Sequence, residues 1–248
     1  MPFNFDIDAL SIETGISSEK LSKNIIVYTA MSTVFPLLEI SGCEVGLFGG
    51  TALNMIYFGK KQRLSYDLDI FSYSASALSI LKKAGAKVKY SGMMPANMKR
   101  PSARLDYSGA VIDLVNAEKG MEKPQKRQAY SILYYYRQLI PPVVVPSYSL
   151  EYLLAEKTMA LLDRNELKDI YDTWIGCNLI EDTPKYARYL RAIAKKRDIK
   201  DIAAYADYRI AHMLNNIDYY EKKDIETINK ASAFIMLKSI RTFLDAMI

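Results

Sequence analysis

The hydrophobic and polar positions of the chain change their spacing near residue 145. Before it, short apolar runs separated by Gly, Ser and Asp are typical of strands that alternate with helices, whereas after it apolar positions recur at helical spacing. The segment IPPVVVPS at 140–147 lies between the two patterns and is interpreted as a proline-rich break. We therefore predict a domain of strands and helices over 1–145 and a helical domain over 146–248.

Local signals place the elements of the first domain. Ser17 or Ser18 can cap a helix that continues toward Leu38. The alternating run LDYSGAVIDL, with Ser108 and Gly109 at its centre, is typical of a hairpin. The other expected helices are 51–58 and 75–84, and the expected strands are 44–48, 66–71, 87–90, 102–107 and 110–115.

Two of these apolar strands are interrupted by acidic residues. Asp67 and Asp69 alternate with Leu68 and Ile70, so a strand places both carboxylates on one face. Carboxylates this close repel each other unless a cation lies between them. The strand VIDLV carries a further acid, Asp113, which is a candidate third ligand. Aspartates at the exposed edge of a strand suit Mg²⁺ or Mn²⁺, so the pattern predicts a divalent metal site; ordinary surface acids are the alternative.

A glycine turn and three polar residues lie upstream of these acids. Gly49 and Gly50 stand between a strand and a helix, where backbone N–H groups can point at an anion, and Thr51 adds a hydroxyl. Arg63 and Ser65 continue the every-second-residue pattern of the acids, so an extended backbone would put them on the same side. The glycine spacing is neither GxGxxG nor GK[ST]. Together these residues outline a triphosphate site.

Two separated motifs resemble a known family. GGTAL followed by RLSYDLD resembles the Gly-Gly-[Ser/Thr] and Asp-x-Asp signature of the DNA polymerase β-like nucleotidyltransferases, and among them the AbiEii/AbiGii-type toxins of toxin–antitoxin and phage-defence systems. SLEYLLAEKTMALLDRNELKDIYDTW is similar to the family's later signature, with Lys-Asp in place of its usual Arg-Asp. The resemblance covers roughly residues 45–175. It implies an α+β fold, in which a polymerase β-like nucleotidyltransferase domain (a mixed sheet with flanking helices) precedes a helical C-terminal domain.

The spacing of the second motif also predicts a helix with its charged residues on one side. Lys157, Arg164 and Lys168 lie on one stripe, so Lys157 and Arg164 could reach the same phosphate chain. Asp169 and Asp172 share a neighbouring face, and the alternative is that Lys168 and Asp172 form an ordinary surface pair. The resemblance implies that Lys157 binds the nucleotide phosphates and that Asp169 or Asp172, contributed to the cleft by the helical domain, completes the active site.

The function implied by the resemblance is transfer of a nucleoside monophosphate from an NTP to RNA, in particular the 3′ end of tRNA, with a winged-helix antitoxin as partner. The segment 82–104, which carries seven Lys or Arg and no acid, fits a nucleic-acid partner, although a solvated face is the alternative. Transfer to a small molecule or a protein hydroxyl, and an inactive nucleotide- or RNA-binding module, are the other hypotheses.

The histidine and cysteine content excludes several kinds of active site. His212 is the only histidine, and the two cysteines, Cys43 and Cys177, have no metal-ligand spacing. Histidine-based triads and zinc sites built from His and Cys are therefore excluded. We find no run of eighteen apolar residues and no signal-peptide layout, so we expect a cytoplasmic protein with no membrane partner.

Overall fold

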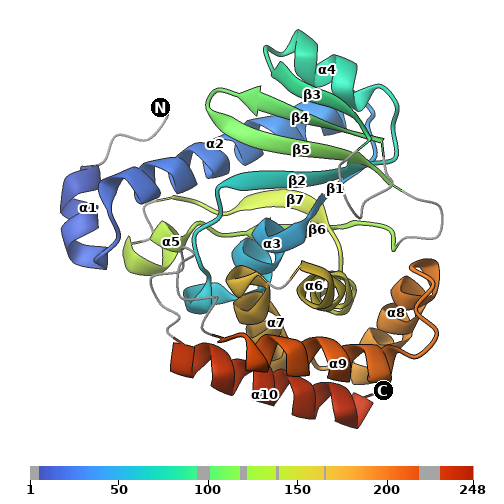
Figure 1. The fold of residues 1–248 in the computed structure, drawn as a ribbon. Helices are drawn as coiled ribbons and strands as arrows, with labels where there is room; N and C mark the ends of the chain where they lie inside the picture. The colour runs from blue at the N-terminus through green and yellow to red at the C-terminus, as the bar shows by residue number, and fades with distance from the viewer. Residues whose placement is uncertain are drawn as a thin grey trace. The chain divides into compact units, whose positions relative to one another are not determined.

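The computed structural model, drawn in Figure 1, describes residues 6–93, 101–117, 122–137, 140–164, 166–217 and 230–247. The chain divides into two units, Met1–Tyr148 and Ser149–Ile248. The described strands all belong to the first unit, and the described part of the second is helical. The architecture is α+β, as predicted.

A mixed sheet organises the first unit. Its strands are β1 (Val45–Phe48), β2 (Asp67–Ser72), β3 (Lys87–Met93), β4 (Pro101–Tyr107), β5 (Ala110–Asn116), β6 (Gln125–Ala129) and β7 (Val143–Ser147). They lie in the order β3-β4-β5-β2-β1-β7-β6. The β2–β5 and β1–β7 pairs are parallel, and the other four pairs are antiparallel.

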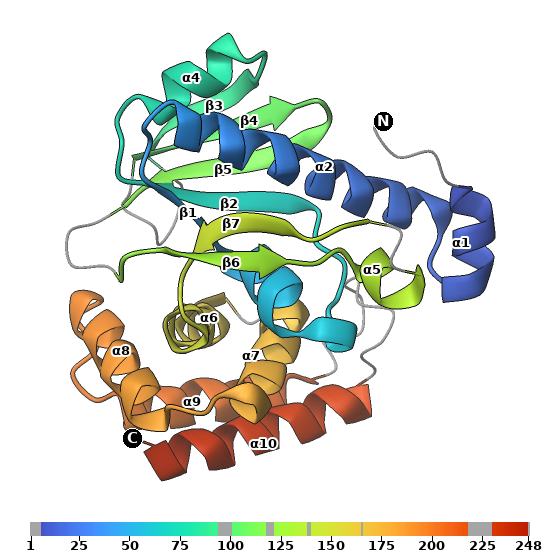
Figure 2. The same ribbon diagram turned by 180° about the vertical axis from the view of Figure 1, so that it is seen from behind.

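Helices flank this sheet. They are α1 (Ile7–Thr14), α2 (Ser18–Ile40), α3 (Gly49–Ala52), the π-helix η1 (Leu53–Tyr57), the 3₁₀-helix η2 (Gly59–Lys61), α4 (Ala77–Lys83) and α5 (Ile132–Arg137). The long α2 packs against β1, β2, β5 and β7, as Figure 2 shows from behind. In the described part of the chain it alone has the length and apolar composition to cross a membrane. A core helix has the same composition, and α2 has that role in this structure.

The structure confirms the predicted hairpin and contradicts part of the predicted proline-rich break. Ser108 and Gly109 both adopt positive φ, 52° and 89°, as a tight two-residue turn between β4 and β5 requires, so this prediction is confirmed. The break predicted at 140–147 is wrong in part, because Val143–Ser147 forms β7. Three consecutive β-branched valines favour a strand, and β7 pairs with β6 at five positions although one of them is Pro146.

The described part of the second unit contains α6 (Leu150–Arg164), α7 (Leu167–Leu179), α8 (Thr183–Lys196), α9 (Ile202–Asn215) and α10 (Lys230–Met247). α6 packs against α7, α8 and α9, while α10 packs against α7, α8 and α9. Gly176 of α7 lies so close to α6 that a Cβ there would be 2.4 Å from the Leu154 Cδ1. The single helical stripe predicted through Lys168 is wrong, because α6 ends at Arg164 and a new helix begins at Leu167.

Candidate active site

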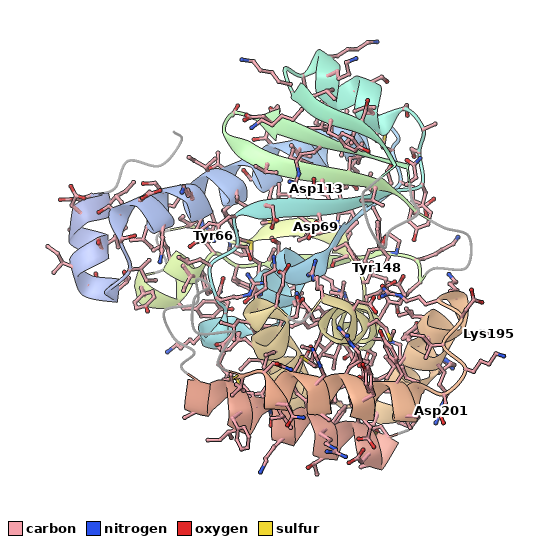
Figure 3. All side chains as sticks on the ribbon, viewed as in Figure 1. Tyr66, Asp69, Asp113, Tyr148, Lys195 and Asp201 are labelled. Atoms are coloured by element: carbon pink, nitrogen blue, oxygen red, sulfur yellow. The ribbon has the colours of Figure 1, made fainter. Side chains whose placement is uncertain are left out.

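The two acids of the Asp-x-Asp motif lie on one face of β2. Asp67 and Asp69 are partly exposed, whereas Leu68 and Ile70 between and after them are fully buried. This alternation is the one expected from the sequence. Figure 3 shows Asp69 on β2 beside Asp113 on the neighbouring strand β5, and the two residues are register partners.

The glycine turn lies directly against Asp69. Gly49 has a φ of +70°, and a Cβ added to it would be 2.1 Å from the Asp69 Oδ2 atom. Only glycine accepts both this backbone conformation and this approach of a carboxylate. The structure therefore brings together the turn and the Asp-x-Asp motif, which are twenty residues apart in the sequence at Gly49 and Asp69.

Two buried polar residues fix the turn to the start of β2. The Thr51 hydroxyl donates to the Asp67 carbonyl oxygen at 2.7 Å, so this predicted phosphate ligand also holds β2 in place. Asn54, which the sequence analysis missed, donates to the Gly50 carbonyl at 2.8 Å and accepts from the Arg63 backbone N–H at 2.7 Å. Its only signal in the sequence is an amide within the otherwise apolar run LNMIY.

Arg63 and Ser65 precede β2 rather than belonging to it. The expectation that Ser65 shares the exposed side of Asp67 is wrong, because this segment is not a strand and Ser65 is buried. Its hydroxyl has no hydrogen-bond partner in the described part of the chain. The Asn24 amide donates to the Ser65 carbonyl at 3.1 Å, and the Arg63 guanidinium donates to the Leu64 carbonyl at 3.1 Å.

Asp113 has a fixed cation in this structure. The Arg104 guanidinium on β4 donates through Nε to Oδ1 at 2.8 Å and through Nη2 to Oδ2 at 2.6 Å. Asp113 raises the pKa of Arg104, and Asp67 and Asp69 add smaller contributions in the same direction. Among the described residues, no group of three His, Cys, Asp or Glu side chains converges to hold a metal ion. Mg²⁺ is commonly held by one or two carboxylates plus substrate phosphates, so Asp67 and Asp69 fit such an ion without Asp113.

The face of the sheet that carries Asp69 has an aromatic floor. Phe48, the register partner of Asp69, lies 3.9 Å from the Phe71 ring centroid, and both rings lie 6.0 Å from that of Tyr148. Gly46 makes room for this floor, since a Cβ there would be 2.8 Å from the Tyr148 ring. All three rings are buried.

The basic segment 82–104 is only partly available to a polyanion. Lys82, Lys83 and Lys87 are exposed on α4 and β3. Lys89 pairs with Asp106 at 2.8 Å, and Arg104 is held by Asp113. Lys99 and Arg100, which belong to the same predicted surface, lie outside the described residues.

In the second unit, the predicted lysine, arginine and two aspartates form one ionic network, in which the lysine and both aspartates are buried and the arginine is partly exposed. The Lys157 ammonium lies 2.8 Å from a carboxylate oxygen of Asp169 and 2.8 Å from one of Asp172. The Arg164 guanidinium donates to both oxygens of Asp169, at 2.6 and 3.0 Å. Both aspartate side chains are 0% exposed, and that of Lys157 is 5% exposed. Lys168 pairs instead with Glu166.

The charges of this network compensate one another. Burial by itself would raise the pKa of Asp169, but the Lys157 ammonium and the Arg164 guanidinium outweigh it and lower the pKa below its usual range. The carboxylate is therefore ionised throughout the neutral range. The alternative of a surface pair between Lys168 and Asp172 is wrong, since Asp172 is fully buried against Lys157.

Comparison with known proteins adds to this geometry. Residues 45–243 match the model of the family described as nucleotidyl transferase AbiEii toxin, type IV toxin–antitoxin system. The match spans well over half of the 248 residues. A search of curated proteins finds no match.

Solved structures provide a second comparison. MenT4, a nucleotidyltransferase toxin from Mycobacterium tuberculosis H37Rv, aligns with a TM-score of 0.61 at 12% identity, covering 98% of this chain and 90% of that one. JHP933 from Helicobacter pylori aligns with a TM-score of 0.49 at 15% identity, covering 93% and 95%. ANT(2″)-Ia in complex with adenylyl-2″-tobramycin aligns with a TM-score of 0.45 at 14% identity, covering 68% and 97%. At its low identity, the MenT4 alignment shows a shared fold, and this confirms the predicted fold class.

Proposed function

The chain belongs to the AbiEii family of nucleotidyltransferase toxins of type IV toxin–antitoxin systems, and from this premise we propose that it transfers a nucleoside monophosphate from an NTP to RNA, at the 3′ end of tRNA. The observation that carries the proposal is the position of Asp67 and Asp69 on one face of β2, with the Gly49 turn against Asp69. Pyrophosphate is the leaving group, and the acceptor hydroxyl attacks the α-phosphorus.

In this proposal Asp67 and Asp69 hold Mg²⁺ or Mn²⁺. When bound, such an ion supplies charge neutralisation at the triphosphate and acidifies the acceptor hydroxyl. The backbone N–H groups of Gly49 and Gly50, which carry no side chains of their own, are proposed to approach the phosphates. Thr51 holds the backbone of Asp67 so that the carboxylate keeps its position.

Arg63 and Ser65 are proposed to bind the triphosphate beside the acids. The Ser65 hydroxyl is buried and has no hydrogen-bond partner among the described residues, so it can bind a phosphate only if this segment opens. For the helical unit we propose, as the family resemblance implies, that Lys157 and Arg164 bind phosphate oxygens and that Asp169 or Asp172 orients them. The network supports the orienting part of this role, because it fixes both cations by charge-assisted hydrogen bonds.

RNA as the acceptor is supported by the exposed lysines Lys82, Lys83 and Lys87, which can neutralise backbone phosphates. Membership of a toxin–antitoxin family implies an antitoxin, which we propose to be a winged-helix protein, and we place the toxin in the cytoplasm together with its tRNA substrate.

The test is transfer of radiolabel from α-labelled NTPs to purified tRNA in the presence of Mg²⁺. We expect labelled tRNA with the wild-type protein and background label with Asp67→Ala. Label on a small molecule or on protein instead of tRNA would replace the proposed acceptor, and undiminished transfer by Asp67→Ala would overturn the proposed site. Growth arrest on expression, relieved by the same substitution, tests the toxin role.

A further inference from the structure

Three charged residues form one row across neighbouring strands. Asp69 of β2 pairs in register with Asp113 of β5, and Asp113 pairs in register with Arg104 of β4. Register partners point to the same face of a sheet, and adjacent strands are about 4.8 Å apart. Arg104 therefore stands on the same face as the Asp-x-Asp motif, two strands from it.

The contact between Arg104 and Asp113 engages both carboxylate oxygens. The guanidinium makes a two-point contact with hydrogen bonds of 2.8 and 2.6 Å. The Asp113 side chain is 6% exposed, while that of Arg104 is 50% exposed. Bidentate pairs between arginine and carboxylate are directional and strong, and a guanidinium stays protonated at any physiological pH. The negative charge of Asp113 is thus balanced before any ligand arrives.

We infer that Arg104 is a built-in cation of the active site, which occupies Asp113 and leaves Asp67 and Asp69 as the two carboxylates that hold the divalent ion. This inference rests on the proposed function. Arg104 is a positioning residue: its guanidinium neutralises Asp113, so this carboxylate adds no net negative charge beside Asp67 and Asp69. The rival arrangement is one in which the ion displaces Arg104 and takes Asp113 as a third ligand.

The two arrangements predict different Mn²⁺ affinities for a set of four variants. Arg104→Gln raises the local negative charge, so we expect Mn²⁺ to bind about tenfold more tightly. Asp113→Asn leaves Arg104 as an unbalanced cation, so we expect Mn²⁺ to bind about tenfold more weakly. In the double variant Arg104→Gln/Asp113→Asn both charges are gone, and we expect an affinity within about threefold of wild type. Arg104→Lys keeps the cation and is expected to behave like wild type.

The measurement is titration of each protein with Mn²⁺ alone, with free Mn²⁺ followed by electron paramagnetic resonance. Thermal unfolding checks that each variant is folded, and the comparison of the double variant with Asp113→Asn still tests the inference if Arg104→Gln does not fold. If the double variant binds Mn²⁺ as weakly as Asp113→Asn does, Asp113 is a metal ligand and the inference is overturned. An Arg104→Gln protein that binds Mn²⁺ like wild type overturns it too. Both outcomes leave the proposed function standing. A wild-type protein that binds no Mn²⁺, and is indistinguishable from Asp67→Asn, overturns the proposed metal site as well.

Discussion

Both units bring acidic side chains together, but they balance the charge by different means. On β2, Asp67 and Asp69 are partly exposed. Between α6 and α7, Asp169 and Asp172 are fully buried and take their cations from the protein. A carboxylate can be buried in ionised form only when it is paired and hydrogen-bonded, so the second group must carry its counter-ions with it. The first group can receive its cation from solution.

This difference changes how loss of activity must be interpreted. Removing a carboxylate on β2 takes away a proposed metal ligand, and we expect it to leave the fold almost as it was. Removing one member of the buried network leaves an unpaired charge inside the helical unit, which destabilises the native state. An inactive Lys157 variant is therefore informative about phosphate binding only when its stability has been measured. The predictions that follow separate the two effects.

The largest effect is expected at Asp67. Because metal-assisted charge stabilisation contributes several kcal/mol to the transition state, Asp67→Asn should lower nucleotide transfer by about 10³-fold. The free energy of unfolding should change by about 0.5 kcal/mol or less, since the side chain is partly exposed. Steady-state transfer assays and urea denaturation measure the two quantities. A large loss of stability would place Asp67 with the structural acids and remove the contrast between the units.

The second-largest effect is expected on stability, in the ionic network of Lys157, Arg164, Asp169 and Asp172. Lys157→Met leaves Asp172 buried without its cation, and we expect a loss of about 3–5 kcal/mol in the free energy of unfolding. Lys168→Met is the matched control, because its partly exposed pair with Glu166 should contribute about 0.5 kcal/mol or less.

A second substitution separates stability from binding at the same position. Lys157→Met/Asp172→Asn removes one cation and one anion, while Asp169 keeps Arg164, so part of the lost stability should return. If NTP affinity returns as well, Lys157 has no direct role in phosphate binding. If stability returns and NTP affinity does not, the ammonium contacts the nucleotide.

The glycine turn gives a smaller effect and a well-matched control. Gly49→Ala should cost about 1–2 kcal/mol for its positive φ, and the new Cβ should also displace the Asp69 carboxylate. Gly85→Ala carries a comparable backbone cost, with φ at +98° but no atom within 4 Å of the new Cβ. We expect both variants to lose stability and only Gly49→Ala to lose transfer activity. Equal activity in the two variants would show that the contact with Asp69 is unimportant.

The sequence predicted several elements of the first unit well, because the signal for each of them is local. The alternation along β2 and the turn at Ser108 and Gly109 both depend on neighbouring residues. β7 was missed because Pro146, together with Pro141 and Pro142 just before the strand, dominates the local signal, while the pairing of β7 with β6 depends on residues elsewhere in the chain.

The prediction of the candidate site was limited in the same way: spacing within one strand was informative, and pairing between strands could not be predicted. Asp67 and Asp69 were found because their spacing alone places them on one face. The Arg104 partner of Asp113 was not found, since a register between strands decides which side chains meet. The network in the helical unit was predicted as a set of residues but not as a buried one. A helix break between Arg164 and Leu167 turns Asp169 back onto Lys157, and nothing in the helical spacing indicates it.

The smallest effect is a dependence of stability on pH. The pKa of Asp169 is lowered in the native state, so its contribution is fully present above its unfolded pKa of about 3.9 and is lost as the pH falls below that value. In that range the unfolded chain binds a proton that the native protein does not, which lowers stability by up to about 1.4 kcal/mol per pH unit. Asp169→Asn should lack this part of the slope between about pH 5 and pH 3, whereas Asp67→Asn should keep it. Urea denaturation across this range measures both slopes, and identical slopes in the wild type and Asp169→Asn would mean that the buried network does not hold its charges in solution.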